Sequence, residues 1–365
     1  MGDNTMLNRV RVDGFKSIRH LDLELGSLNV LIGANGSGKS NFVEVFELLQ
    51  NLTQQHLQQY IGIAGGATRL LYLGAKVTKE IALGFEFGPN SYSCRLSPTA
   101  EDRVIFLDET CTFQGGGHER PYRNSFSTGQ AESMLPEEDV LRRFPVARHV
   151  WHRMSDWVVY HFHDTSRLAP VKTTNSIHDT ASLRSDAGNL AAYLHFLHDH
   201  ALDSYKNIRD AIRMVAPFFD DFVLHPMPEN ADTIRLEWRQ QGTDMYMDAS
   251  SLSDGTLRFM CLATLLLQPQ LPSTILLDEP ELGLHPYAIS VLGGLLRSAS
   301  AKTQVIVATQ SVTLIDQFEL GDIIVADRKD QESTFTRPDA AALAAWLKDY
   351  SLGELWEKNV LGGRP

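Results

Sequence analysis

Residues 28–40 read LNVLIGANGSGKS, and this stretch decides the fold of the 365-residue chain. Its first part, 28–32, is an apolar run apart from Asn29, which is typical of a strand buried on both faces. Residues 33–40 then match the phosphate-binding pattern Gly-x4-Gly-Lys-Ser, known as Walker A. Apolar residues at helical spacing follow, at Phe42, Val45, Phe46 and Leu49. A strand, a glycine-rich loop and a helix in this order predict a P-loop nucleotide-binding fold.

The residue types in this loop suit the binding of phosphate. Glycines let successive backbone N–H groups turn toward phosphate oxygens, and the helix N-terminus adds partial positive charge. Lys39 is expected to reach the β and γ phosphates of ATP, and the Ser40 hydroxyl is expected to hold Mg2+. We therefore expect nucleotide contacts from the loop and the first helical turn, namely Asn35, Gly36, Ser37, Gly38, Lys39, Ser40 and Asn41.

A second apolar strand ends in acidic residues. Residues 275–280 read ILLDEP, the pattern known as Walker B. Asp278 is placed to enter the Mg2+ shell, and Glu279 is placed to polarise the attacking water. Because Mg2+ keeps several waters, one carboxylate beside Ser40 is sufficient. We predict that Ser40 and Asp278 are the metal ligands and that Glu279 is catalytic.

The rest of the chain predicts an α/β fold. Apolar strands at 274–278, 304–310 and 322–327 alternate with helical patterns, which favours a parallel sheet with crossover helices. Residues 81–96 alternate around a turn at 89–90 and predict an antiparallel hairpin. Helical spacing returns at 187–215, whereas 98–180 is irregular. We expect a P-loop core with an antiparallel β lobe and an inserted, mainly helical subdomain, divided as 1–97, 98–215 and 216–365.

Composition narrows the class of protein. Hydrophobic residues at 43% and charged residues at 21% are globular values, which disfavours disorder and rod-like folds. The three cysteines form no CxxC pair, which disfavours a disulfide framework and a structural zinc site. The chain lacks an apolar run of membrane-spanning length and signal-peptide features, so we expect a cytoplasmic protein without a membrane partner. The net charge of -12 argues against a uniformly basic nucleic-acid binder but leaves a local patch open.

Residues 252–256 read LSDGT and precede an apolar helix. On its own this pattern predicts a helix cap and a turn. Its place ahead of Walker B, however, resembles the signature of ATP-binding-cassette ATPases. In that superfamily a serine and a glycine at a helix N-terminus contact the γ phosphate bound by the opposite subunit. The resemblance assigns this role to Ser253 and Gly255.

Other motifs narrow the resemblance. FKS at 15–17, DEPE at 278–281 followed by GLHP, ATQS at 308–311 and LGELW at 352–356 resemble the compact bacterial AAA-family ATPases of the SMC/RecF/OLD-like branch. The resemblance implies a D-loop at 281–285 and a switch residue at Gln310, where many cassette ATPases have histidine. Glutamine can orient water but cannot carry a proton. The implied glutamine loop is left open among Gln54, Gln55, Gln58 and Gln59, for which a polar helix surface is favoured.

These motifs lead to a functional hypothesis. We expect an ATPase that closes as a head-to-tail homodimer, or a higher oligomer, with ATP and Mg2+ between Walker A of one subunit and the signature of the other. The resemblance implies a role in DNA sensing, repair or antiphage defence, with DNA as a candidate ligand. Few residues follow Asp327, so an effector such as a nuclease is expected to be a separate protein.

Two alternatives stay open. A transporter's nucleotide-binding subunit is disfavoured by the long interval between Gly33 and Ser253 and by LSDGT in place of LSGGQ. A scaffold that holds ATP without turnover is disfavoured by Glu279.

Two further patterns are assigned to structure. The histidine sets at 161–164 and 195–200 are interpreted as paired or exposed side chains, without zinc. The stripe of Leu343, Trp346, Leu347 and Tyr350 is predicted to pack against the chain's own core.

Overall fold

A six-stranded sheet carries the P-loop in the computed structural model, which describes residues 6–115, 120–126 and 128–363. Its strand order is β17-β16-β3-β15-β14-β8, and all neighbours are parallel except the β16–β17 hairpin. In chain order the strands are β3 (Leu28–Ile32), β8 (Trp157–Tyr160), β14 (Thr274–Asp278), β15 (Gln304–Thr309), β16 (Ile323–Lys329) and β17 (Glu332–Thr336). The predicted parallel sheet is therefore confirmed.

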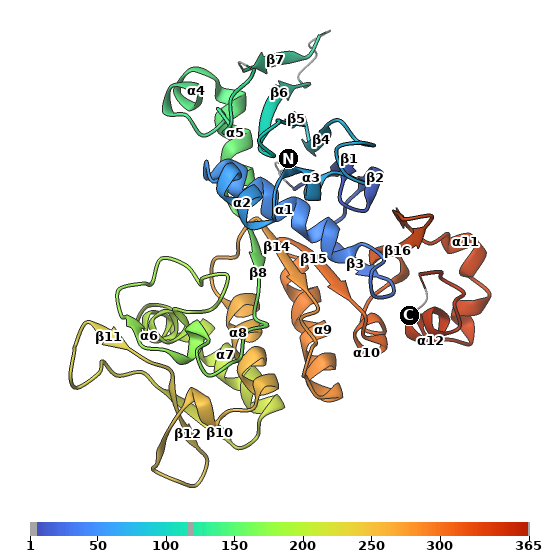
Figure 1. Cartoon of the computed structure of the whole chain (residues 1–365). Helices are drawn as coiled ribbons and strands as arrows, with labels where there is room; N and C mark the ends of the chain where they lie inside the picture. Colours follow the sequence, from blue (N-terminus) through green and yellow to red (C-terminus); the bar gives the residue numbers. More distant parts are fainter. Residues whose placement is uncertain (1–5, 116–119, 127, 364–365) are drawn as a thin grey trace.

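Both faces of this sheet are covered, which explains the continuous apolar strands. Leu276 of β14 faces a core shared with α1 (Lys39–Thr53), whereas Ile275 and Leu277 face a second core on the other side. Several helices contribute to that second core, four of the longer ones among them (Figure 1). These four are α6 (Leu190–His200), α7 (Leu202–Val215), α8 (Asp254–Leu267) and α9 (Pro286–Ser300). Alternate residues of one strand thus enter two separate cores.

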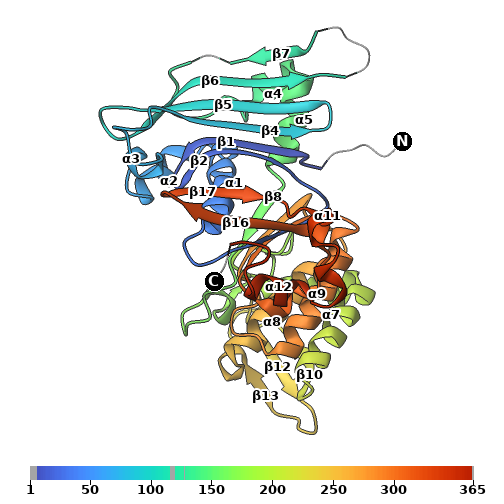
Figure 2. The ribbon, with the colours of Figure 1, turned by 90° about the vertical axis from the view of Figure 1, so that its right-hand side faces the viewer.

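A second six-stranded sheet is antiparallel and lies beyond α1 (Figure 2). Its order is β2-β1-β4-β5-β6-β7. The strands are β1 (Arg9–Phe15), β2 (Ile18–Glu24), β4 (Ile81–Phe87), β5 (Asn90–Pro98), β6 (Val104–Phe113) and β7 (Tyr122–Ser125). The predicted hairpin is confirmed, since β4 and β5 pair from Phe87 and Asn90 at the turn. Two short helices, α2 (Leu57–Ile63) and α3 (Ala67–Leu70), follow α1.

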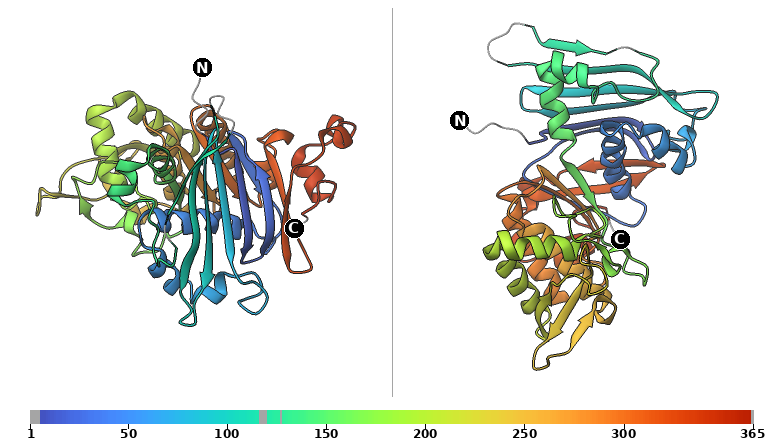
Figure 3. Two further views of the ribbon diagram at one scale, coloured as in Figure 1. Left: turned by 90° about the horizontal axis from the view of Figure 1, so that it is seen from above. Right: turned by 90° about the vertical axis from the view of Figure 1, so that its left-hand side faces the viewer.

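The range 98–215 does not form one inserted unit, which differs from the expectation. Its first part adds β6 and β7 to the antiparallel sheet, and α4 (Glu138–Arg143) and α5 (Pro145–Met154) lie beside that sheet (Figure 3). Strand β8 then joins the parallel sheet as an edge strand. The glycine run at 115–117 and the prolines obscured these strands, because such residues usually mark loops.

Smaller elements surround helices α6 to α8. They are η1 (Pro170–Lys172), β9 (Asn175–Ser176), β10 (Phe219–Val223), β11 (Thr233–Ile234), β12 (Glu237–Gln240), β13 (Tyr246–Asp248) and η2 (Ala249–Ser251). Strands β10, β12 and β13 form one small sheet, and β9 pairs with β11. The turn η2 leads directly into the LSDGT stretch, so this region places the signature.

The last part of the chain begins directly after the switch strand β15. It contains α10 (Val312–Ile315), η3 (Leu320–Asp322), α11 (Ala340–Leu343), η4 (Trp346–Lys348) and α12 (Leu352–Glu357). Leu343 is buried, but Trp346 is 45% exposed, so the stripe predicted to pack against the core does so only in part. Helix α11 ends at Leu343, so the helical spacing that would place Leu343 and Trp346 on one face does not continue to Trp346. None of the helices in the described ranges is long and apolar enough to cross a membrane.

Trp157 joins the two layers of strands. Its ring lies 5.5 Å from Phe46 of α1 and 5.8 and 5.5 Å from Phe85 and Phe87 of β4, between ring centroids. We predict that Trp157→Ala lowers the free energy of unfolding by about 3–5 kcal/mol, because it opens a cavity among large rings. Urea denaturation measures this. The half-exposed Trp346 provides the matched control, and a Trp346→Ala loss as large as that of Trp157→Ala would contradict the assignment.

Candidate nucleotide-binding site

The P-loop follows β3 at the carboxyl edge of the parallel sheet, and packing requires two of its glycines. A Cβ atom on Gly33 would lie 2.2 Å from the Ala326 carbonyl oxygen. One on Gly38 would lie 2.2 Å from Ser333 Oγ, and Gly38 also has a φ of +108°. These are distances at which side chains cannot be accommodated. The glycines of the motif therefore seat the loop against β16 and β17 as well as exposing its N–H groups.

Ser17 of the FKS stretch stabilises the position of the P-loop through hydrogen bonds. Its hydroxyl is buried, lies 2.6 Å from Ser333 Oγ and accepts a hydrogen bond of 2.5 Å from Asn41 Nδ2. Asn41 belongs to the first turn of α1, so this serine connects β17 to the P-loop helix. Asn41, predicted as a nucleotide contact, is thus held in place by Ser17.

Lys39 lies folded over the loop. Its Nζ donates to the carbonyl oxygens of Gly33 at 2.7 Å and Ala34 at 3.1 Å, and the residue is buried. Burial lowers the pKa of the Lys39 ammonium, while the nearby carboxylates of Glu279, Asp278 and Glu281 oppose that shift. Among the described residues, this buried ammonium is hydrogen-bonded only to neutral carbonyls, which it is suited to exchange for phosphate oxygens.

Asp278 reaches the same edge from β14. Burial raises the pKa of the Asp278 carboxyl group, and a hydrogen bond with Ser40 opposes this shift. One oxygen, Oδ1, is buried and lacks a hydrogen-bond partner among the described residues. An orphaned carboxylate oxygen beside a serine hydroxyl fits the oxygen ligands that Mg2+ prefers. The structure thus brings the two predicted metal ligands together.

Glu279 and Gln310 meet directly. Gln310 Nε2 donates to Glu279 Oε1 and, at 2.6 Å, to Asn35 Oδ1 of the P-loop. Glu279 has a φ of +43°, and its backbone N–H donates to the Ala308 carbonyl at 2.8 Å. This left-handed conformation is unusual for glutamate and places the residue outside the regular strand. The predicted catalytic pair therefore forms one network with the phosphate loop.

Glu281 is a site residue to which the sequence analysis gave no chemical role of its own. It is buried, and its Oε1 accepts hydrogen bonds from the Thr309 hydroxyl and, at 3.1 Å, from the Gln310 backbone N–H. Burial raises the pKa of its carboxyl group, and the Thr309 bond opposes this. Glu281 connects the D-loop to the switch strand, and its place as the last acid of the DEPE stretch is the only sequence signal for it.

The signature residues lie apart from this cluster. Ser253 is exposed and caps α8, with its Oγ accepting from the Thr256 N–H at 3.1 Å. A Cβ on Gly255 would lie 2.2 Å from the Gly283 carbonyl, so the signature packs against the D-loop. Among the residues that the structure describes, neither Ser253 nor Gly255 has a hydrogen bond or ion pair to Walker A.

The segment after β8 and the helix α8 supply further residues to which the sequence analysis gave no role in the site. Arg258 of α8 is buried and donates to the carbonyl oxygens of Phe162, at 2.9 Å, and His163, at 3.2 Å. His163 and Asp278 line the same cavity of about 10 Å³. His161 pairs with Glu47 at 3.0 Å. The sequence signal available for the residues after β8 was an apolar strand that ends in polar residues, as Walker B does.

Two of the four glutamines left open for the glutamine loop bind the antiparallel lobe. Gln55 Nε2 donates to Glu137 at 2.8 Å, and Gln58 Nε2 donates to the Ala131 carbonyl at 2.6 Å.

Comparison with known proteins agrees with this geometry. The family described as "AAA domain, putative AbiEii toxin, Type IV TA system" matches residues 28–316, so the chain belongs to it. The chain is also 23% identical to an OLD nuclease of Thermus scotoductus, covering 95% of this chain and 68% of that protein. The predicted membership of the SMC/RecF/OLD-like branch of ATPases is confirmed.

Solved structures show the same fold. An Smc head bound to the C-winged-helix domain of ScpA matches with a TM-score of 0.59 and 15% identity, covering 91% of this chain and 97% of that one. An Smc head with an extended coiled coil, bound to the C-terminal domain of ScpA from Pyrococcus furiosus, matches with a TM-score of 0.57 and 16% identity, covering 94% and 99%. The predicted P-loop α/β fold with an antiparallel lobe is confirmed.

Lys39→Ala is predicted to weaken ATP binding at least about a hundredfold, because charge-assisted hydrogen bonds contribute about 1.5–3 kcal/mol each. Calorimetric titration with ATP measures the affinity. Lys79→Ala is the matched control, since Lys79 is exposed and its Nζ bonds only the Ala75 carbonyl, at 2.9 Å, among the residues that the structure describes. An unchanged affinity in a folded Lys39→Ala protein would remove Lys39 from the site.

Proposed function

We propose that this protein hydrolyses ATP between two copies of itself arranged head to tail. The observation that carries the proposal is the separation, within one chain, of the signature from the Walker A and Walker B residues. Lys39, Asp278, Glu279 and Gln310 cluster at one edge of the sheet, while Ser253 is exposed and, within the described part of the chain, forms no hydrogen bond with them. A second copy, related by two-fold symmetry, supplies the missing half of each site.

Exposed apolar side chains support a protein contact beside the signature. Leu282 of the D-loop is 51% exposed, and Tyr287 in the first turn of α9 is exposed to a similar degree. The D-loop touches the signature through Gly283 and Gly255. Large apolar residues on one exposed face are typical of interaction surfaces.

The chemistry assigned to the residues follows from their contacts. Glu279 accepts a proton from the attacking water, and Gln310, which bridges Glu279 and Asn35, holds that water in line with the γ phosphate. Lys39 releases the Gly33 and Ala34 carbonyls and binds phosphate oxygens. Ser40 and Asp278 hold Mg2+, which supplies neutralisation of the phosphate charge.

The biological role that we propose is DNA sensing, repair or antiphage defence in the cytoplasm. ATP closes the homodimer and hydrolysis opens it, and this change of state acts on a separate effector such as a nuclease. The similarity to an OLD nuclease supports the class of process, and the similarity to Smc heads bound to ScpA domains supports a partner protein. DNA is the proposed stimulus, which is tested by measuring ATP turnover with and without duplex ends and single strands.

Glu279→Gln is predicted to slow hydrolysis by at least about a hundredfold, the usual effect of losing a general base. ATP and Mg2+ still bind, because Lys39, Ser40 and Asp278 are unchanged, so the closed dimer accumulates. Light scattering coupled to size-exclusion chromatography measures its mass with and without ATP. A variant that stays monomeric with ATP, at concentrations where the wild type dimerises, would refute the sandwich.

Mixing two inactive variants tests the composite site. Lys39→Ala and Ser253→Arg are each predicted to be inactive alone. Their heterodimer contains one site with both halves intact, so hydrolysis returns to at most about half of the wild-type rate if the two sites act independently. The measurement is phosphate release from the mixture, with co-purification as evidence of heterodimers.

A control addresses obligatory coupling between the sites. Heterodimers of the wild type and Glu279→Gln lose ATP hydrolysis if the two sites must act together. They keep partial hydrolysis if the sites act independently. If this control shows that the sites are independent and the Lys39→Ala/Ser253→Arg heterodimers still recover no hydrolysis, Ser253 is excluded from the composite site.

A further inference from the structure

The signature carries a negative charge where the proposed partner presents phosphate. Asp254 stands between Ser253 and Gly255 in the first turn of α8, and its side chain is 66% exposed. In the proposed dimer, the γ phosphate of ATP bound by the second copy meets this turn. Two like charges brought together while water is excluded repel each other strongly. A carboxylate at this position therefore needs a cation close by.

Lys172 is that cation. Its side chain is only 8% exposed, and its Nζ lies 3.7 Å from Asp254 Oδ1. The same Nζ donates to the Thr165 carbonyl oxygen at 2.6 Å. Lysine is among the residues least often buried, so its burial beside the signature calls for a specific role.

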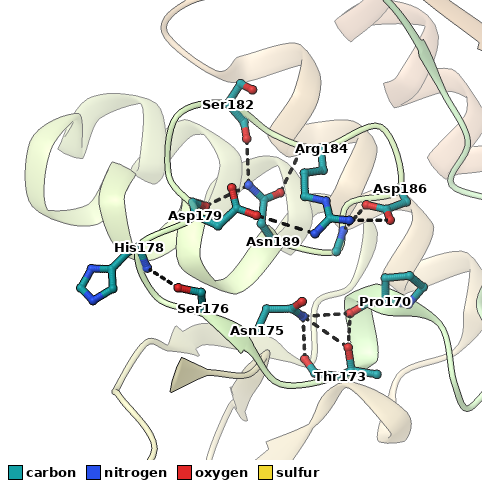
Figure 4. A network of polar contacts seen from close by, with 11 residues as sticks. Pro170, Thr173, Asn175, Ser176, His178, Asp179, Ser182, Arg184, Asp186 and Asn189 are labelled. Atoms are coloured by element: carbon teal, nitrogen blue, oxygen red, sulfur yellow. Dashed lines mark hydrogen bonds and ion pairs between the residues drawn. The ribbon is translucent and has the colours of Figure 1, made fainter. Parts of the chain in front are cut away.

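The backbone around Lys172 is held by side-chain hydrogen bonds (Figure 4). Lys172 ends the turn η1, where Asn175 Nδ2 donates to the carbonyls of Pro170, at 3.1 Å, and Thr173, at 3.0 Å. The turn η1 packs against η2, which leads into the signature. The cation is thus presented by a fixed turn rather than by a mobile surface loop.

A second set of bonds fixes the loop that follows. The fully buried Asn189 donates from Nδ2 to the carbonyls of Asp179, at 2.9 Å, and Ser182, at 2.8 Å (Figure 4). Its Oδ1 accepts the Arg184 N–H at 2.9 Å. These hydrogen bonds hold the segment between η1 and α6 in one conformation. They help to keep η1 beside the signature.

The nearby Arg258 does not take this role. Its charge also acts on Asp254, but its guanidinium donates hydrogen bonds to the Phe162 and His163 carbonyls and, among the described residues, forms no ion pair with Asp254. The ammonium of Lys172 is the cation paired with Asp254 in the described chain.

We propose that Lys172 is a positioning residue of the composite site, whose ammonium neutralises Asp254 so that the signature accepts the γ phosphate of ATP bound by a second copy. This inference rests on the proposed head-to-tail dimer. In the separate subunit the ion pair contributes little, because water screens the exposed Asp254 carboxylate. Its effect appears when the interface closes and excludes that water.

The test measures ATP-driven dimerisation in the Glu279→Gln background, which separates closure from hydrolysis. Lys172→Gln is expected to raise the ATP concentration for half-maximal dimerisation about tenfold or more, because it leaves Asp254 unpaired at the interface. Asp254→Asn in the same chain is expected to restore most of that loss. Lys302→Gln makes the same change of net charge at an exposed residue just before β15, at the opposite edge of the sheet, and is the matched control.

Each outcome decides the inference. Lys172 also holds the Thr165 carbonyl, so a purely structural role predicts a loss that Asp254→Asn does not restore, and that result overturns the proposal. If Lys172→Gln fails to fold, Asp254→Asn alone decides: the inference predicts a lower half-maximal ATP concentration, and a higher one overturns it. A Glu279→Gln protein that does not dimerise with ATP refutes the proposed function instead, before Lys172 is examined.

Discussion

The structure depends on one electrostatic constraint, the burial of Lys39 among Asp278, Glu279 and Glu281 at the carboxyl edge of the parallel sheet. Charged groups leave water only when they pair and when their remaining polar atoms find partners. The carbonyls of the P-loop, Thr309, Gln310 and Ser40 supply those partners. Two carboxylate oxygens, Asp278 Oδ1 and Glu281 Oε2, stay unpaired within the described residues. The cluster is therefore arranged for added positive charge.

The fold supplies this cluster from distant parts of the chain. Strands β3, β14 and β15 are neighbours in one parallel sheet, so their carboxyl ends bring Lys39, Glu279 and Gln310 to one place. Apolar residues on both faces of these strands fill two separate cores, which prevents the strands from shifting in register. The close approach of Gly33 to β16 and of Gly38 to β17 then fixes the P-loop against these two strands.

The signature region is connected to the cluster through neighbouring segments rather than directly. Gly255 touches the D-loop at Gly283, and Glu281 of that loop bonds the backbone of Gln310. Arg258 bonds the segment after β8, which lies beside Asp278. In the proposed dimer, a contact made at the signature by the second copy would act on groups that surround both Walker B and the switch residue. This arrangement is consistent with the closure of a dimer controlling hydrolysis in the proposed mechanism.

The amino-acid sequence by itself determined the P-loop, Walker B, the parallel sheet and the 81–96 hairpin, because each depends on local spacing of glycine, lysine and apolar residues. It did not reveal Glu281, His163, Arg258 or Lys172 as neighbours of the site, nor that β6 and β8 join different sheets. Those positions depend on contacts between residues far apart in the chain, such as Arg258 with Phe162, and on burial that local patterns do not report. Tertiary structure decided them, because a buried charge takes its partner from whichever segment the packing brings near.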